Sequence, residues 1–306
     1  MTFPLVSYLI PAYNHERFVQ QCLDSVLADP YDNKELIVID DGSSDSTASI
    51  IEEWIVSHGD SMTVQFRSRP NRGVTATLNE LAGLARGEFL RLGASDDYFL
   101  PGGSRLLADY LVAYPDKLAV IGDGMVVNEA SEVVYRSSMT DLHHADKRHY
   151  ATDHGIITSV ISRWALAGPV LMIRKGAIPV LGVWDERLRI DDWYLFLRLV
   201  ARNGLGFIDA AVCAYRLHDT NTCRVTDPLK RIRNLSETRE MAAQHVPFFS
   251  SPYDALLKAQ CRLIDAKVAY LQRRPLATGR HLAAYALLRL QVGLMEGETS
   301  FRGACE

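Results

Sequence analysis

Two adjacent carboxylates, Asp96 and Asp97, stand where a predicted strand ends. They follow an apolar run at 88–92 and the small residues Ala94 and Ser95, and a Pro-Gly-Gly turn comes soon after. Neighbouring negative charges repel, so keeping both ionised requires a cation or strong donors nearby. A divalent ion that also carries substrate phosphates meets this need, because Mg²⁺ is typically held by one or two carboxylates and phosphate oxygens. The alternative is that both residues cap the next helix, a position that Asp favours.

An alternation of apolar runs and helix-spaced segments fills the first part of the chain and predicts how these carboxylates are positioned. The expected strands are at 5–10, ended by Pro11, and at 35–40, 62–66 and 88–92; the expected helices are at 16–27, 46–57 and 74–85. This rhythm predicts an α/β fold with parallel strands and helices on both faces of the sheet. Ligands of such sheets bind beyond the carboxyl ends of the strands. The residues expected at that edge are Tyr13, Asp40, Asp41, Asp96 and Asp97.

The rest of the chain is less regular and ends in helices. Strands are expected at 118–121, 170–173, 207–209 and 212–215, and helices at 106–114, 193–201, 256–272 and 281–295. A polar segment at 128–154 contains four histidines whose spacing fits no zinc template, so we expect a mobile loop on the substrate side. These histidines are His143, His144, His149 and His154. Because only helices are expected after Asp227, we predict two domains, 1–226 and 227–306.

Composition excludes several classes of protein. The 306 residues carry a formal net charge of −4 and a pI near 6.1, which argues against nucleic-acid binding. Five scattered cysteines without CxxC spacing favour a reducing compartment over disulfides or a zinc site. The chain lacks a secretory signal pattern and an apolar run of the roughly 18 residues that cross a bilayer, so we expect a cytoplasmic protein.

Six motifs occur in an order that resembles family 2 glycosyltransferases, and they cover roughly the first 225 residues. They are SYLIPAYN at 7–14, VIDDGSSDST at 38–47, NRG at 71–73, ASDD at 94–97, the acidic pairs at 185–186 and 191–192, and YRLHDTN at 215–221. The resemblance implies a GT-A fold, mostly parallel, with a C-terminal helical extension. It also implies an inverting transfer from a nucleotide-diphospho-sugar, assisted by Mn²⁺ or Mg²⁺. UDP is the default nucleotide, with dTDP and GDP open, and the acceptor would be a glycan or lipid-linked hydroxyl in cell-surface polysaccharide synthesis.

The resemblance also assigns roles to individual residues. Asp96 and Asp97 with His218 would hold the metal, and the metal would neutralise charge on the departing diphosphate. Asp192 would be the general base, six residues before Arg198 as in the family. The donor would contact Pro11, Tyr13, Asn14, Asp41, Asn71, Gly73, Ser95 and Asp96.

Each of these roles has a structural alternative. Asp191 and Asp192 could be helix caps, since carboxylates are favoured at helix N-termini. His218 could be a core histidine, and Tyr13 could simply pack.

Two departures from the family pattern also stand out. Ala94 replaces a frequent aspartate, and Leu78-Asn79 replaces an Arg-Asn pair whose basic contact Arg72 would have to supply.

Other functions fit the sequence less well. A catalytically impaired nucleotide-sugar-binding protein is favoured only by Ala94, because Asp192 and His218 stand where activity needs them. A nucleotidyltransferase or a dinucleotide-binding oxidoreductase would show glycines after the first strand, where this chain has Pro11-Ala12-Tyr13-Asn14.

The C-terminal segment carries an apolar stripe of a different kind. Leu282, Leu287, Leu290 and Leu294 recur at helical spacing beside Arg280 and Arg289. Packing against the main domain is the common explanation of such a stripe. The alternatives are a peripheral contact with the inner face of the membrane or formation of a homo-oligomer.

Overall fold

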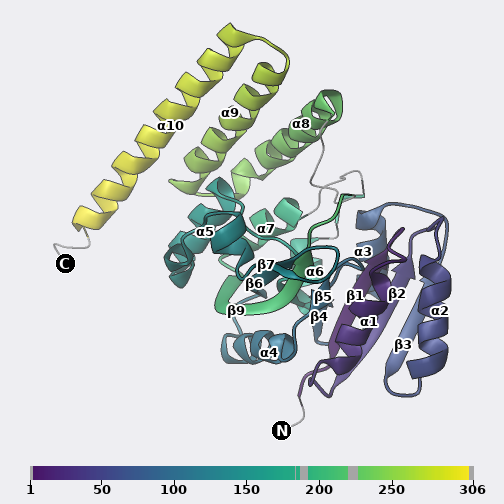
Figure 1. Cartoon of the computed structure of the whole chain (residues 1–306). Coiled ribbons are helices and arrows are strands. Elements are labelled where there is room, and N and C mark those ends of the chain that lie inside the picture. Colours follow the sequence, from purple (N-terminus) through teal and green to yellow (C-terminus); the bar gives the residue numbers. More distant parts are fainter. Residues whose placement is uncertain (1–2, 183, 187–191, 220–226, 303–306) are drawn as a thin grey trace.

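The computed structural model describes residues 3–182, 184–186, 192–219 and 227–302. A single mixed sheet forms the body of the protein, and three C-terminal helices form a further layer beside it (Figure 1). The strand order is β3-β2-β1-β4-β8-β6-β9-β5, with β7 paired to β6 outside this path. This arrangement confirms the predicted α/β architecture.

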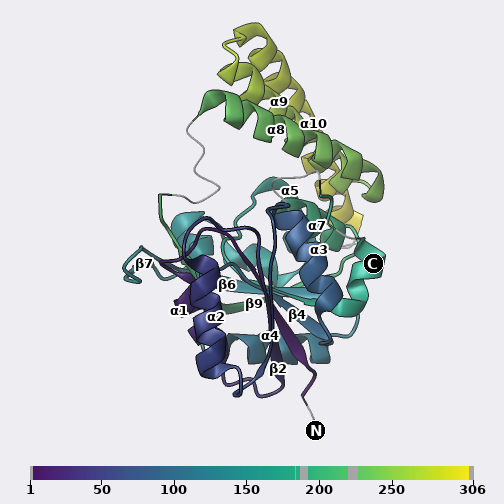
Figure 2. The same cartoon turned by 90° about the vertical axis from the view of Figure 1, so that its right-hand side faces the viewer.

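The first half of the sheet is parallel, as predicted. Its elements are β1 (Val6–Ala12), α1 (Val19–Ala28), β2 (Lys34–Asp40), α2 (Thr47–His58), β3 (Thr63–Ser68), α3 (Val74–Leu84) and β4 (Phe89–Leu92). Strand β1 pairs with both β2 and β4, and β2 pairs with β3. Helices α1 and α2 lie together on one face of the sheet and α3 lies on the other (Figure 2). Strands β1 and β2 are almost fully buried and mostly apolar, which is typical of central strands in a parallel sheet covered on both faces, whereas the edge strand β3 is half-buried to exposed.

The prediction that Pro11 ends the first strand was wrong. Strand β1 continues through Ala12, and Pro11 lies opposite Ile39 of β2. The register explains why a residue without an N–H is tolerated here. Strand β4 ends at Leu92, opposite Leu9, so no β4 carbonyl remains beside Pro11 to need a donor.

The second half of the sheet is mixed. Strand β8 (Leu171–Arg174) is antiparallel to β4 and to β6 (Ala119–Val127), β6 is parallel to β9 (Leu205–Arg216), and β5 (Tyr98–Phe99) is antiparallel to β9. The two strands predicted at 207–209 and 212–215 are one continuous strand, a correction that the ladder explains. The exposed stretch around Asp209 breaks the apolar pattern, but pairing with β6 continues through a register shift opposite Asp123.

The polar segment after β6 is anchored by one buried carboxylate. Asp123 accepts hydrogen bonds from the Ser137 and Ser138 hydroxyls and the Met139 N–H, and pairs with Lys147 at 2.7 Å. These contacts hold β7 (Val133–Tyr135), the π-helical turn Ser138–Leu142 and the 3₁₀ turn Lys147–Ala151. The helix that follows, α5 (Asp153–Ser162), was not predicted, because its buried apolar residues are β-branched and have low intrinsic helix propensity.

The remaining helices complete the body and form the extension. They are α4 (Gly103–Ala113), α6 (Ile178–Leu181), α7 (Asp192–Val200), α8 (Pro228–His245), α9 (Tyr253–Leu271) and α10 (Pro275–Arg302). Helix α9 packs on α5, on α8 and on α10, which joins the extension to the body (Figures 1 and 2). Among the described residues, no helix is long and apolar enough to cross a membrane. The boundary between two domains near residue 227 remains a prediction.

Candidate active site

The carboxyl ends of β1, β2 and β4 meet at one edge of the sheet, and the predicted site residues gather there. The loop after β1 is tied to the loops after β2 and β4. The His15 N–H donates to Thr47 Oγ1 at 2.8 Å, and the Ser44 N–H donates to Asn14 Oδ1 at 2.8 Å. The His15 ring lies 2.8 Å from the hydroxyl of Ser95, in the loop after β4. Loops at strand ends that are 80 residues apart in the sequence therefore form one surface.

Three side chains with metal-ligand atoms converge at this edge. The His218 Nε2 and Asp96 Oδ2 atoms are 2.9 Å apart, and the His15 Nε2 atom lies 3.8 Å from the same carboxylate oxygen. One ligand atom from each of the three residues lies within 4.8 Å of the others. Asp96 and His218 were predicted from the sequence, but His15 was missed. The available signal was a histidine immediately after the predicted donor residues Tyr13 and Asn14.

Electrostatics favour the metal-binding protonation states of Asp96 and His15. Burial opposes ionisation of Asp96, but the hydrogen bond to His218 and the nearby His15 outweigh it and lower the pKa of the carboxyl. Burial lowers the pKa of His15 below its ordinary value, and the attraction of Asp96 offsets this only in part. An ionised carboxylate and a neutral imidazole are the forms that bind a metal ion.

The donor set suits a divalent ion such as Mn²⁺. Two imidazoles and one carboxylate offer nitrogen and oxygen ligands in a partly buried setting, and the distances allow one ion to contact all three. None of the four histidines at 143–154 takes part in such a group in the part of the chain that the structure describes.

Asp97 has a different environment from its neighbour. It is buried, and its Oδ1 atom accepts the backbone N–H of Arg216 at 2.7 Å. This bond fixes the loop after β4 to the end of β9, the strand that leads to His218. The structure thus brings Asp96, rather than Asp97, into the group that could hold an ion.

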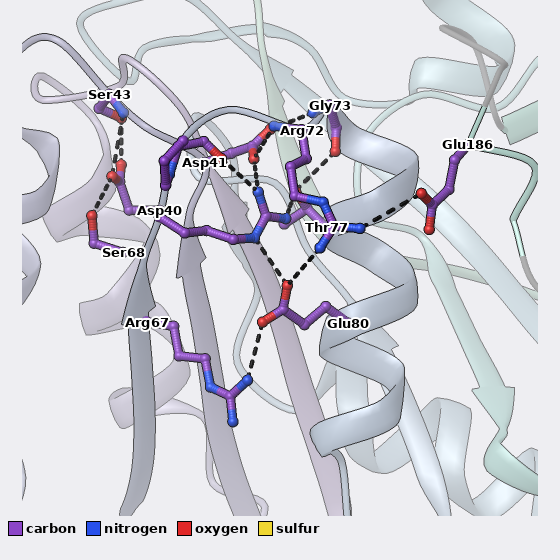
Figure 3. A network of polar contacts seen from close by, with 12 residues as sticks. Asp40, Asp41, Ser43, Arg67, Ser68, Arg72, Gly73, Thr77, Glu80 and Glu186 are labelled. Carbon is purple, nitrogen blue, oxygen red and sulfur yellow. Dashed lines mark hydrogen bonds and ion pairs between the residues drawn. The ribbon is translucent and has the colours of Figure 1, made fainter.

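Asp41 is the centre of a polar network beside the loop at 69–73 (Figure 3). Its Oδ1 atom accepts the Arg72 N–H at 2.9 Å and pairs with the Arg69 guanidinium, and its Oδ2 atom accepts the Gly73 N–H at 2.9 Å. Arg69 in turn donates to Glu80 of α3 at 2.9 Å. A carboxylate can accept about four hydrogen bonds, so Asp41 keeps some capacity for a ligand while it shapes the loop at 69–73.

The other predicted donor residues differ in exposure. Tyr13 and Asn71 are exposed, Pro11 and Gly73 are half-buried, and Ser95 is buried beneath the His15 ring. Asp40 faces the same edge but bonds to Ser43 and Ser68 (Figure 3).

Asp192 is the first residue of α7. Its side chain keeps exposed surface, while the protein around it desolvates the carboxyl and raises its pKa above the ordinary value. The helix behind it is firmly packed, since the Trp193 indole donates to the Val160 carbonyl at 2.8 Å. Asp191, the competing carboxylate, lies outside the described residues, as do the last two residues of the motif at 215–221.

An amide clamp fixes the segment that follows α6. The Asn79 side chain of α3 donates to the Trp184 carbonyl and accepts the Trp184 N–H, both at 2.9 Å. Arg72 adds an ion pair with Glu186 at 3.7 Å. From the sequence, Asn79 was only part of a departure from the family pattern, because a contact across 105 residues leaves no local signal that could have identified its role.

Solved structures with the same architecture are glycosyltransferases of the GT-A fold. A mannosyltransferase from Pyrobaculum calidifontis, solved with GDP-Man and Mn²⁺, has a TM-score of 0.65 and 18% identity, covering 96% of this chain and 81% of that one. Residues 1–349 of S. aureus TarS, solved with UDP-GlcNAc, have a TM-score of 0.60 and 16% identity, covering 98% and 92%. The fold of this chain is therefore GT-A, the fold of nucleotide-sugar-dependent transferases.

Comparison of sequences identifies the family as well as the fold. The model of glycosyl transferase family 2 matches residues 7–166, more than half of the chain, so the chain belongs to that family. An uncharacterized glycosyltransferase of Rickettsia typhi is 27% identical over 224 residues, 72% of this chain and 66% of its own length. The poly-beta-1,6-N-acetyl-D-glucosamine synthase of Staphylococcus epidermidis is 29% identical over 198 residues, 63% and 46% of the two chains. This chain thus spans less than two thirds of either relative. The predicted family is confirmed.

Proposed function

We propose that this glycosyltransferase moves a sugar from a nucleotide-diphospho-sugar, UDP-linked by default, to a hydroxyl of a glycan or lipid-linked acceptor, with inversion. The observation that carries the proposal is the Asp96–His218 pair, 2.9 Å apart at the same strand ends as the loops around Asn14 and Asp41. A role in cell-surface polysaccharide synthesis is supported by the names of relatives, among them the poly-N-acetylglucosamine synthase and a chondroitin synthase of Pasteurella multocida that is 35% identical over 103 residues.

The donor would lie across the edge formed by the loops after β1, β2 and β4. Exposed Tyr13 can stack on the base, and Asp41 can accept from a base imide or ribose hydroxyl. Small side chains at Ala94 and Ser95 let the backbone approach the ribose. Pro11, Asn14, Asn71 and Gly73 would shape the same surface.

Asp96 and His218 would hold Mn²⁺ or Mg²⁺. Asp97 would fix the loop after β4 to the end of β9, or supply a further oxygen ligand. When bound, the ion neutralises charge that develops on the leaving diphosphate. The protein contributes by holding Asp96 ionised beside His218 and by fixing both loops through Arg216.

Asp192 would be the general base. An inverting transfer needs a proton acceptor on the face of the sugar opposite the leaving group, within reach of the acceptor hydroxyl. The desolvated Asp192 carboxyl has a raised pKa and is therefore a stronger base than an ordinary aspartate. The packed face of α7 fixes the backbone from which it projects.

A donor panel tests this function. We expect one nucleotide sugar to raise the melting temperature and to be slowly hydrolysed, both only with Mn²⁺ or Mg²⁺ present. Binding without hydrolysis or transfer to any acceptor would instead favour the alternative, a nucleotide-sugar-binding protein that has lost catalysis. Absence of binding by UDP, dTDP and GDP sugars alike would contradict both.

We further propose that the C-terminal helices bring the enzyme to an anionic membrane surface on the cytoplasmic side, where a lipid-linked acceptor would be presented. Helix α10 buries Val292 but exposes leucines on another face: Leu276, Leu287, Leu290 and Leu294 are each at least 66% exposed. Residues 275–294 contain Arg280 and Arg289 and no acidic residue. Basic helices with an exposed apolar stripe bind anionic lipid interfaces.

A hollow beside α10 adds to this basic character. It has a volume of about 360 Å³ and lies between α5 and α10, with Arg148, Arg163 and Arg289 in its wall. Arg148 is engaged by Asp146 at 2.6 Å.

Flotation with phosphatidylglycerol-containing vesicles tests the membrane contact. We expect wild-type protein to float and the double variant Leu287→Glu/Leu294→Glu to remain in the dense fraction. Val56→Glu, at a still more exposed apolar position on α2, is the control and should float. If wild-type protein does not float but has the mass of a dimer that the double variant loses, the stripe joins two copies and the membrane proposal is wrong.

A further inference from the structure

His15 is held by contacts of both its backbone and its ring. Its backbone N–H is bonded to Thr47 Oγ1 at 2.8 Å, and its ring Nδ1 atom lies 2.8 Å from Ser95 Oγ. The ring meets the His218 ring edge-on, with centroids 5.8 Å apart and planes at 83°. Contacts from three loops thus fix both the backbone and the plane of this imidazole.

The contact with Ser95 determines which ring nitrogen faces the carboxylate. Because Nδ1 is engaged by the hydroxyl, Nε2 is the atom turned towards Asp96, at 3.8 Å. A histidine that binds a metal usually has its other nitrogen hydrogen-bonded, which fixes the tautomer and the ring orientation. Ser95 supplies that contact for His15. A separation of 3.8 Å between two ligand atoms is also what two ligands of one ion require, since neither occupies the other's position.

We propose that His15 Nε2 is a third protein ligand of the ion, so that the site is His15-Asp96-His218 and prefers Mn²⁺ to Mg²⁺. The inference deepens the proposed function, on which it rests for the role of the ion in donor binding. The number of protein ligands also determines how the ion and the nucleotide would bind. Three side chains bind the ion before any nucleotide arrives, leaving the other positions for diphosphate oxygens and water.

The metal preference follows from the chemistry of the ligands. Mg²⁺ takes oxygen ligands in strict octahedral geometry, gives up its water reluctantly and is usually held by carboxylates and phosphates. Imidazole nitrogens suit transition-metal ions, and affinities for a given site rise from Mn²⁺ towards the later metals of the row. Two imidazoles beside one carboxylate therefore discriminate against Mg²⁺, whereas a site of Asp96 and Asp97 would not.

Nucleotide-free titration with Mn²⁺ tests the proposal directly. We expect wild-type protein to bind one Mn²⁺, detected by loss of the free-ion electron paramagnetic resonance signal, and excess Mg²⁺ to displace it poorly. His15→Gln should weaken binding by roughly tenfold or more while keeping a hydrogen bond to Ser95. The matched control is His58→Gln, since His58 stacks on Trp54 at the far end of α2 and should not affect Mn²⁺ affinity.

A measurement on the wild-type protein makes the test independent of how well the variant folds. Pulsed electron paramagnetic resonance of bound Mn²⁺ should detect nitrogen couplings from two imidazoles. Coupling to one imidazole, an unchanged affinity in folded His15→Gln, or displacement of Mn²⁺ by equimolar Mg²⁺ would each overturn the proposal. Donor hydrolysis without nucleotide-free Mn²⁺ binding would refute this inference alone, whereas Mn²⁺ binding without turnover of any donor would refute the proposed function alone.

Discussion

Arg216 is bonded to the backbone of Asp96, the proposed metal ligand, and replacing it should reveal how much the site depends on one buried cation. Its side chain is 1% exposed and stacks on the Phe18 ring, with its guanidinium carbon 4.8 Å from the centroid. Its guanidinium nitrogens donate to the carbonyls of Asp96 (2.8 Å), Asn128 (2.9 Å) and Glu129 (3.3 Å), to Ser131 Oγ (3.0 Å) and to Gln21 Oε1 (2.5 Å). One planar group thus joins α1, the loop after β4 and the turn after β6.

Arg216→Lys keeps the charge but loses the planar fork. A lysine ammonium has three donors at one point, so it cannot reach acceptors on all sides and cannot stack on Phe18. Each buried acceptor left without its donor costs about 1–3 kcal/mol, so loss of two of these bonds should lower the unfolding free energy by about 3–5 kcal/mol. For a chain of this length the unfolding entropy is about 0.64 kcal/mol/K, so the melting temperature should fall by about 5–8 °C.

Differential scanning calorimetry gives the comparison, with Arg105→Lys as the matched control. Arg105 is exposed and pairs with Asp109 one turn away, so its replacement should shift melting by less than about 1 °C. Mn²⁺ affinity should also fall in Arg216→Lys, because the Asp96 backbone loses its donor. If Arg216→Lys melts within about 1 °C of wild type, the reasoning on this buried cation is wrong.

Two further predictions concern acid stability and positioning. Burial opposes ionisation of Glu35, but hydrogen bonds from Ser7 and Arg86 outweigh it and hold its pKa below the ordinary value of 4.5. A depressed pKa contributes stability that is complete above 4.5 and is lost as pH falls through the folded-state pKa. Urea denaturation of Glu35→Gln should therefore show lower stability at neutral pH and a smaller further loss below pH 4.5 than wild type; parallel pH profiles would contradict this. Asn79→Leu should release the Trp184 backbone and lower kcat by roughly tenfold with little change in donor affinity. Loss of donor affinity with unchanged kcat would place Asn79 in the donor site instead.

The sequence was most informative where local pattern and function coincide. The buried strands β1, β2 and β4 are apolar runs with polar residues at their ends, so both the parallel half of the sheet and the position of Asp96 could be predicted. Strand β9 was predicted as two strands because its pattern is interrupted at Asp209, although pairing with β6 continues there. Helix α5 was missed because its β-branched residues disfavour a helix locally, and its packing on α7 and α9 is not visible in the sequence.

Contacts between distant segments account for what the sequence could not reveal about the site. His15 becomes a candidate ligand through Ser95, 80 residues away, and through Asp96 and His218. From the sequence, Asp97 is as good a candidate ligand as Asp96. In the structure its carboxylate accepts a hydrogen bond from the β9 backbone, 119 residues away. Local spacing contains no information on either contact.

Turnover of Asp192→Asn tests the central claim most directly. Hydrolysis of the nucleotide sugar, with water as acceptor, is measured together with donor affinity in wild type and Asp192→Asn. Asp153→Asn serves as the matched control, because Asp153 also begins a helix but pairs with Lys117. Glycosyl transfer with Asp192 as general base predicts a fall in turnover of roughly a hundredfold or more in Asp192→Asn, with donor affinity and folding unchanged and the control active. Normal turnover by Asp192→Asn would contradict this mechanism, and loss of activity in Asp191→Asn alone would transfer the role to the neighbouring carboxylate.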